Sequence, residues 1–185
     1  MAKVVATYHK DCNDGTTAAA VVLKKFPEAQ LFPLHHSYRE EDIKPVLDLL
    51  DSETECYTVD CGLGVKEFLK AGCEVITLDH HIGVKEELEE IARENKNYTF
   101  VFDYNKSGAS LAWSYFFPDE SLPELIKYVE DSDLWKQRYG EDTKYANNYI
   151  SMFRNDPVTV LGFIEGDLLE IKSKGEIITM YVDKE

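Results

Sequence analysis

The sequence predicts an α/β fold: a parallel β-sheet flanked by helices, followed by a mostly helical C-terminal part. Short β-rich runs alternate with segments of helical apolar spacing in the first part of the chain. The segments between most of the runs have the length of the crossovers that parallel strands need. A chain of 185 residues with 44% hydrophobic residues can also bury a continuous core. These three observations favour a folded α/β protein.

Each predicted strand is a run rich in β-branched and aromatic residues. In chain order the runs end at VVATY, QLFPL, CYTVD, EVITLD and YTFVF. Apolar spacing predicts helices between them, over residues 15–26, 40–50, 64–71 and 84–95.

From Ser107 the pattern becomes mostly helical, with SGASLAWSYFF, LPELIKYVED and a long stretch after Asp156. The final LLEIKSKGEIITMYVDKE predicts a helix that stops. We therefore expect an α/β domain over residues 1–138 and a helical extension of the same domain over residues 139–185, with no second substrate domain.

Composition limits the classes of partner. Lysine and arginine total 20 against 35 acidic residues, a formal net charge of −15, so most of the surface would repel duplex nucleic acid. A small phosphorylated substrate remains compatible, because bound divalent metal ions can reverse the local field. The four cysteines show neither zinc-site spacing nor the density of a disulfide scaffold, which favours a reducing cytoplasm. Neither a secretory signal nor a membrane-spanning run is present in the sequence.

Acids and histidines follow the predicted strands, in HKDCNDG, DCG, DHH and DYNKSG. In an open parallel sheet, ligands collect beyond the carboxyl ends of the strands. Carboxylate and imidazole ligands together suit Mn²⁺, Mg²⁺, Fe²⁺ or Co²⁺. Two such ions could clamp a phosphoryl group and activate water if a carboxylate bridged them. Asp60 is the best candidate for the bridge, with His9 and Asp14 from one loop and His80 from another.

DHH at residues 79–81, preceded by HKDCNDG and VDCG and followed by VEDSDLW, resembles the ordered motifs of the DHH phosphoesterase superfamily. The resemblance spans about residues 4–138 and implies a metal-dependent phosphoesterase domain. It also implies that His81 faces the substrate, where it contacts a phosphate oxygen or assists proton transfer, and that Asp79 holds an imidazole tautomer. The metal ligands that it implies are His9, Asp14, Asp60, His80 and Asp131.

The sequence departs from the family pattern in two places. Cys12 occupies the position, two residues before Asp14, where the family commonly has an aspartate. Asp11 could substitute for it through a small loop adjustment, or this metal site is weaker or holds a different ion. In the fourth motif, spacing leaves both Asp131 and Asp133 open as the ligand, although motif order favours Asp131. Nothing after Asp156 resembles the family's C-terminal substrate domain, which favours small substrates or a partner that completes the site.

Three residues are predicted to contact the substrate in addition to His81. Ser107 and Gly108 would open a helix whose free amides, with Lys106, could cradle a phosphate. Arg154 is a further possible phosphate contact. A second double histidine, His35 and His36, lacks suitable acidic neighbours, which favours a surface or substrate-facing role over metal binding.

We therefore expect a divalent-metal-dependent phosphoesterase. It would hydrolyse a phosphoester or phosphoanhydride bond in a small nucleotide-like substrate or short oligonucleotide, with Mn²⁺ as the first choice of ion and Mg²⁺ or Co²⁺ possible. The alternatives are an inorganic pyrophosphatase and a catalytically idle protein that binds a metal or a nucleotide.

Overall fold

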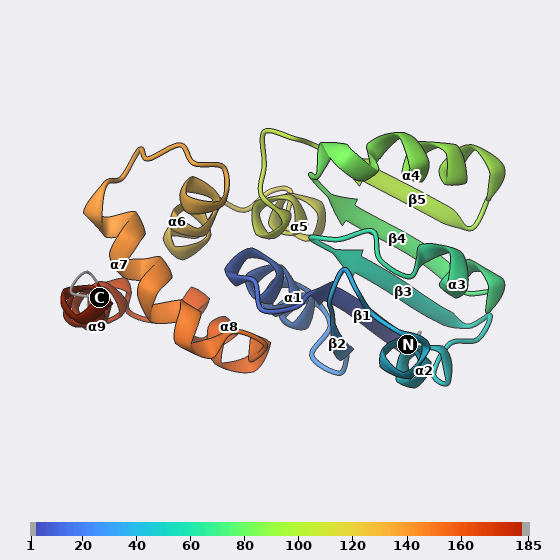
Figure 1. Cartoon of the computed structure of the whole chain (residues 1–185), viewed down its shortest axis with the longest axis horizontal. Helices are drawn as coiled ribbons and strands as arrows, with labels where there is room; N and C mark the ends of the chain where they lie inside the picture. Colours follow the sequence, from blue (N-terminus) through green and yellow to red (C-terminus); the bar gives the residue numbers. More distant parts are fainter. Residues whose placement is uncertain (1–2, 183–185) are drawn as a thin grey trace.

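The computed structural model describes residues 3–182, and it contains a five-stranded parallel sheet in the order β2-β1-β3-β4-β5 (Figure 1). The strands are β1 (Lys3–His9), β2 (Gln30–Leu34), β3 (Thr54–Val59), β4 (Glu74–Asp79) and β5 (Tyr98–Phe102). Each strand coincides with one of the predicted β-rich runs. The predicted α/β class and parallel sheet are therefore confirmed.

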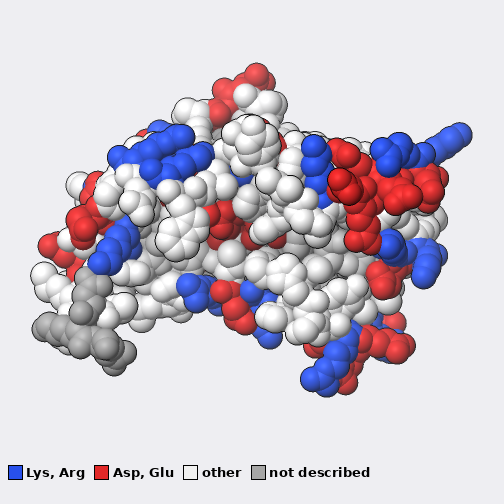
Figure 2. All heavy atoms as spheres, turned by 45° about the horizontal axis from the view of Figure 1, so that its top comes forward, with Lys and Arg blue, Asp and Glu red and all other residues white. Residues whose placement is uncertain are grey.

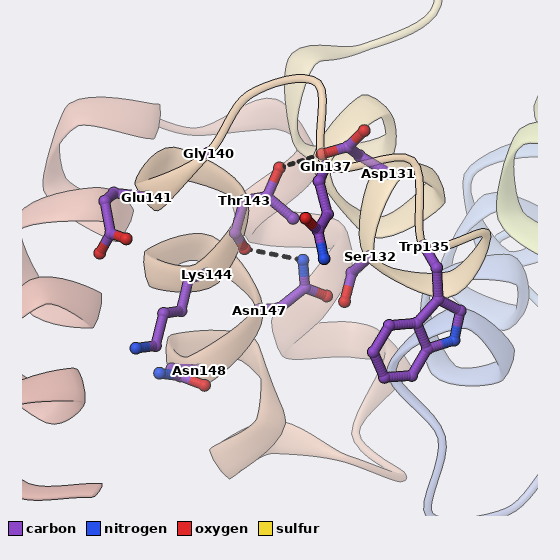
Figure 3. A pocket seen from close by; sticks show the side chains of 10 residues that line it. All are labelled: Asp131, Ser132, Trp135, Gln137, Gly140, Glu141, Thr143, Lys144, Asn147 and Asn148. Atoms are coloured by element: carbon purple, nitrogen blue, oxygen red, sulfur yellow. Dashed lines mark hydrogen bonds between the residues drawn. The ribbon is translucent and has the colours of Figure 1, made fainter. Parts of the chain in front are cut away.

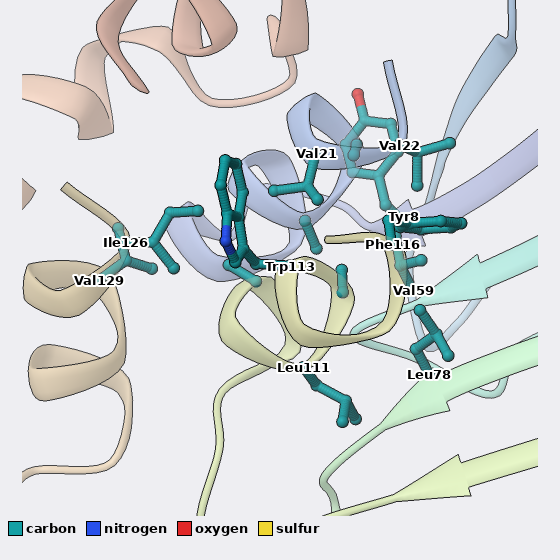
Figure 4. Close-up of a cluster of buried hydrophobic side chains, with 14 of the residues drawn as sticks. Tyr8, Val21, Val22, Val59, Leu78, Leu111, Trp113, Phe116, Ile126 and Val129 are labelled. Carbon is teal, nitrogen blue, oxygen red and sulfur yellow. The ribbon is translucent and has the colours of Figure 1, made fainter. Parts of the chain in front are cut away.

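Helices cover both faces of the sheet, because the strands carry apolar side chains on both sides. On one face Val4, Ala6 and Tyr8 of β1 belong to a core with α1 and α5, whereas Val5 points into a second core with α2, α3 and α4. Figure 4 shows the first core. The helices of the two layers are α1 (Asn13–Lys25), α2 (Glu40–Leu47), α3 (Val65–Lys70), α4 (Ile82–Glu94) and α5 (Gly108–Phe116).

The C-terminal part is helical, as expected, and α6 (Glu124–Asp133) coincides with the predicted helix in LPELIKYVED, but the elements after it differ from the predicted ones. They are α7 (Glu141–Ile150), the 3₁₀ turn η1 (Ser151–Phe153), α8 (Pro157–Glu165) and α9 (Leu168–Val182). The stretch after Asp156 forms two helices instead of one, because α8 ends before Gly166. The helix α7 was not predicted. The last three residues of the predicted terminal helix, 183–185, lie outside the described residues.

The C-terminal helices pack on one another and on the α/β part. A Cβ atom on Gly175 of α9 would lie 1.9 Å from the carbonyl oxygen of Tyr145, so α9 approaches the backbone of α7 closely. Ile150, Val160 and Ile171 belong to the same core as α1 and α5. Within the described residues, no helix is long and apolar enough to cross a membrane.

The strand order positions a ligand crevice. The strand β2 pairs with one edge of β1, and β3 pairs with the other edge of β1. The connection that follows β1 therefore leads to one side of the sheet, and the connection that follows β3 leads to the opposite side. Ligands bind open α/β sheets outside the carboxyl ends of the strands at such a switch point. His9 ends β1 and Asp60 follows β3, which places both residues at this crevice.

Candidate metal centre

Asp60 lies at the centre of the site. It follows β3, is 1% exposed and has a left-handed backbone with φ of 57°. Its Oδ1 lies 3.2 Å from His80 Nε2, whereas its buried Oδ2 has no hydrogen-bond partner among the described residues. Burial, followed by the charges of Asp14 and Cys12, raises the pKa of Asp60 well above its ordinary value. A buried carboxylate with an unpartnered oxygen is costly unless a cation satisfies it.

One group of potential metal ligands lies beside Asp60 Oδ2. His9 Nδ1 is 3.9 Å from this oxygen, and His9, Cys12 and Asp60 each offer an atom within 4.8 Å of the others. Burial lowers the pKa of His9, and the neighbouring His36 adds to the effect; the centroids of these two rings are 4.5 Å apart. His9 is therefore held neutral, the form in which imidazole binds a metal.

A second group lies on the other side of Asp60. Asp14, His80 and Asp133 offer atoms within 4.8 Å of one another. His80 Nε2 is 3.7 Å from Asp14 Oδ2 and 3.5 Å from Asp133 Oδ2. Burial lowers the pKa of His80, while burial and the charge of Asp14 raise the pKa of Asp133 to about 7.

These residues fit divalent metal ions. Burial and the charge of Asp14 raise the pKa of Asp60 and of Asp133, the two imidazoles are held neutral, and Asp60 Oδ2 has no partner among residues 3–182. Oxygen and imidazole nitrogen ligands are typical of divalent metal sites, and the thiol of Cys12 adds a softer donor. The acidic and histidine clusters are thus compatible with a divalent metal site.

The helix α5 positions Asp14, and this finding corrects the predicted roles of Ser107 and Gly108. The backbone amides of Gly108 and Ala109 donate to the two Asp14 oxygens at 2.5 and 2.9 Å. The fully buried Ser107 caps α5 and accepts from the amide of Ser110. The amides predicted to cradle a phosphate are therefore occupied by a carboxylate of the site.

Gly108 also approaches Asp60 closely, because a Cβ atom there would lie 2.5 Å from Asp60 Cβ. We expect Gly108→Ala to lower the free energy of unfolding of the metal-free protein by about 1–3 kcal/mol through this overlap. Urea unfolding measures the effect. Gly83→Ala is the matched control, because nothing lies within 4 Å of its added Cβ atom and alanine favours helix. Equal stability of Gly108→Ala and wild type would contradict the close approach.

Asp131 does not join the cluster, contrary to the ligand set that motif order favours. Its buried carboxylate accepts from Thr143 Oγ1 at 2.6 Å and from the amides of Arg138 and Tyr139 at 2.8 and 3.4 Å. Although burial by itself raises its pKa, these hydrogen bonds outweigh burial and hold the pKa of Asp131 below its ordinary value. The structure places Asp133 beside His80 instead.

Asp11 and Arg154 lie at the rim of the site. Asp11 is exposed and pairs with Asn155, which donates Nδ2 to Asp11 Oδ1 at 2.6 Å and accepts from the Asp11 amide at 3.0 Å. Arg154 Nε donates to Asn13 Oδ1 at 3.0 Å. The side chain of Asp11 therefore contacts Asn155 of the C-terminal part. Asp11 is absent from the metal-ligand clusters of the described residues. Sequence reasoning missed Asn155, because the sequence does not show that its loop reaches the first motif.

His81 offers a further potential ligand atom, within 4.8 Å of atoms of Asp60 and His80, and it is oriented by Asp79. Asp79 Oδ1 is 2.7 Å from His81 Nδ1 and also accepts from the amides of His80 and His81 at 2.7 and 3.0 Å. The hydrogen bond to Asp79 raises the pKa of His81. This contact engages Nδ1, so Nε2 is the ring nitrogen that remains for a substrate.

Two adjoining hollows open at the site. A cleft of about 360 Å³ is lined by residues of both ligand groups, among them His9, Cys12 and Asp133, and by Arg154. A cavity of about 520 Å³ lies between the end of α6 and α7 (Figure 3). Both are lined by Ser132, Trp135 and Asn147; the Trp135 side chain is 83% exposed. The face in Figure 2 carries interspersed acidic and basic side chains.

Comparison with known proteins establishes the fold. No protein-family model matches the chain. It is 25% identical over 159 residues to "Uncharacterized protein R106" of Acanthamoeba polyphaga mimivirus, which covers 78% of this chain and 36% of that protein. The chain therefore spans about a third of the length of this curated relative.

Among solved structures, the chain resembles an uncharacterized protein from Helicobacter pylori G27, with a TM-score of 0.65 and 17% identity over 95% of this chain and 62% of that one. It aligns with a TM-score of 0.48 to exonuclease RecJ bound to manganese (20% identity; 92% of this chain, 50% of that one). The same score relates it to RecJ in complex with Mn²⁺ from Thermus thermophilus (16% identity; 97% and 35%). The H. pylori protein shares the fold of this chain.

Proposed function

We propose that the chain is a divalent-metal-dependent phosphohydrolase, which cleaves a phosphoester or phosphoanhydride bond in a small nucleotide-like substrate. The observation that carries the proposal is the buried Asp60 carboxylate, which lies between two groups of ligands at the switch point of the sheet. The resemblance of the four motifs to the DHH superfamily supports the same activity. Four free cysteines, one of them half-buried beside the site, favour a reducing cytoplasm as its location.

The proposed ligands divide between two positions. Asp60 would be shared by the two positions, with His9 and Cys12 as ligands on one side and Asp14, His80 and Asp133 on the other. When bound, two divalent ions would lower the pKa of a water molecule and neutralise charge on the phosphoryl group. Mn²⁺ is the first choice for the oxygen-rich position.

The remaining polar residues act on the substrate. Asp79 fixes the Nδ1 side of His81, so that Nε2 can donate to a phosphoryl oxygen or give a proton to the leaving group. Arg154 lines the cleft and supplies a positive charge for the phosphate. Ser107 and Gly108 are left out of this role, because Ser107 caps α5 and the Gly108 amide holds Asp14.

The adjoining cavity favours a substrate with an organic group over pyrophosphate. A phosphate held between the two ligand groups would place the rest of a nucleotide beside Trp135, Ser132 and Asn147. An exposed tryptophan offers a face on which a base can stack. Its loop carries two left-handed residues, Trp135 and Gln137, which are seldom retained without a compensating role.

Hydrolysis of a small panel tests the proposal. The full chain, loaded with Mn²⁺, is incubated with pyrophosphate, a cyclic mononucleotide, a cyclic dinucleotide, a linear dinucleotide and bis-p-nitrophenyl phosphate. We expect release from at least one nucleotide and loss of release on chelation. Release from pyrophosphate alone would identify a pyrophosphatase. Tight metal binding without release from any compound would identify an idle metal-binding protein and contradict the proposal.

Replacement of Trp135 tests the substrate side of the site. We expect Trp135→Ala to raise the KM for the nucleotide substrate by about tenfold, because base stacking on an aromatic ring contributes about 1–3 kcal/mol. Trp135→Phe should retain most of the affinity. Stability should be unchanged in both variants, because the side chain is 83% exposed. An unchanged KM in Trp135→Ala would show that the base of the substrate does not stack on Trp135.

A further inference from the structure

Cys12 is a donor of a different kind from the other proposed ligands. We propose that its thiolate binds the metal ion held by His9 and Asp60, and that this position therefore selects Zn²⁺ over Mn²⁺. The inference rests on the proposed metal site and extends it, because it assigns different ion preferences to the two positions. Thiolate ligands select softer ions such as Zn²⁺, whereas carboxylates suit Mn²⁺ and Mg²⁺.

The fold brings the thiol to the metal position. Cys12 is the residue immediately before α1, in extended conformation, at the loop that leaves β1 after His9. It is half-buried, and its sulfur lies within 4.8 Å of ligand atoms of His9 and Asp60. The other three cysteines are fully buried and are absent from the ligand clusters of the described residues.

A second observation indicates that this position binds a cation. Asp60 Oδ2 is buried, has no hydrogen-bond partner in the described part of the chain and lies 3.9 Å from His9 Nδ1. Ligand atoms around a tetrahedral Zn²⁺ lie about 3.3–3.8 Å apart, since its bonds are about 2.0–2.3 Å long. The three donors therefore need to approach one another by only about 1 Å.

The surroundings of Cys12 argue against a purely apolar role. A buried cysteine that serves as a small apolar residue lies among aliphatic side chains. Cys12 instead lines the cleft together with His9, Asp14 and Asp133, and its sulfur lies within 4.8 Å of an imidazole nitrogen of His9 and a carboxylate oxygen of Asp60. The opposite position, formed by Asp14, His80 and Asp133, contains only oxygen and nitrogen donors and suits Mn²⁺.

Absorption spectra with Co²⁺ test the thiolate ligand without a substrate. Co²⁺ replaces Zn²⁺ in such sites, and a bound thiolate gives a charge-transfer band in the near ultraviolet. We expect the metal-free full chain to develop this band on titration, Cys12→Ser to lose it, and Cys61→Ala, which removes a buried cysteine beside Asp60, to retain it. A band of equal intensity in Cys12→Ser and wild type would overturn the inference, as would no band in either protein.

The ion preference is measured separately by competition with a chromophoric chelator. Most sites bind Zn²⁺ more tightly than Mn²⁺, so the informative quantity is the change in the affinity ratio between variants. We expect Cys12→Asp to shift the ratio toward Mn²⁺ by at least about tenfold, because a carboxylate replaces the thiolate. Cys61→Ala should leave the ratio unchanged. An unchanged ratio in Cys12→Asp would contradict the selection of Zn²⁺.

These measurements separate the inference from the proposed function. A charge-transfer band that depends on Cys12, in a protein that hydrolyses none of the compounds, would support the thiolate ligand and contradict the proposed hydrolase activity. Hydrolysis with Mn²⁺ that requires Asp60, in a protein that shows no charge-transfer band with Co²⁺, would support the proposed hydrolase activity and contradict the thiolate ligand.

Discussion

We expect Asp60→Asn to abolish the proposed hydrolysis and at the same time to stabilise the metal-free protein. Hydrolysis is lost because an amide cannot bridge two cations as a carboxylate does. We expect stability to rise by about 1–3 kcal/mol, because burial and the charge of Asp14 disfavour the ionised form of Asp60, and asparagine has no ionised form. Phosphate or nucleotide release and urea unfolding without metal measure the two effects.

Asparagine is a suitable replacement at this position. Asp60 has a φ of 57°, and asparagine adopts left-handed backbone as readily as aspartate does, so the fold should be retained. Asp48→Asn is a matched control, because Asp48 is an exposed aspartate that pairs with Lys44 on the surface, away from the site. Retained turnover in Asp60→Asn would exclude Asp60 as the bridging ligand. A less stable metal-free variant would show that its carboxylate is satisfied within the chain.

We expect Asp131→Ala to lower the free energy of unfolding by about 2–4 kcal/mol. The change removes a buried carboxylate that accepts from Thr143 and from the amides of Arg138 and Tyr139, and it leaves these donors without their partner. It also releases the loop of residues 134–140, which carries Trp135. Urea unfolding of the metal-free chain measures the loss.

Asp133→Asn is the matched comparison for Asp131→Ala, because Asp133 lies two residues after Asp131 on the same helix. We expect it to weaken Mn²⁺ binding by at least about tenfold with little loss of stability, since its carboxylate faces His80 and Asp14. Asp131→Ala should bind Mn²⁺ as wild type does wherever it is folded. A reversal, with Mn²⁺ affinity lost in Asp131→Ala and kept in Asp133→Asn, would restore Asp131 as the ligand.

The sequence was sufficient for the sheet and for much of the site, for a physical reason. Parallel strands bring their carboxyl ends to one edge, so polar residues that follow strands must lie near one another. His9, Asp14, Asp60 and His80 could therefore be placed together from strand ends alone, and the structure brings them together.

Residues whose position depends on tertiary packing could not be placed in this way. Asp131 and Asp133 are two residues apart on α6, so they point in different directions around the helix. Which of them faces the sheet depends on how α6 packs. Likewise, the amides at the start of α5 look free in the sequence, because Asp14, their acceptor, lies far away in the chain.

Anomalous scattering from a crystal of the full chain soaked in Mn²⁺ tests the metal centre most directly. We expect two peaks about 3.5–4 Å apart on either side of the Asp60 carboxylate. At saturating Mn²⁺ and without Zn²⁺, one peak should lie among Asp14, His80 and Asp133, and the other beside His9 and Cys12, at the position that Zn²⁺ would otherwise fill first. The absence of a peak at Asp60 in crystals soaked at saturating Mn²⁺, or peaks only elsewhere on the molecule, would contradict the account.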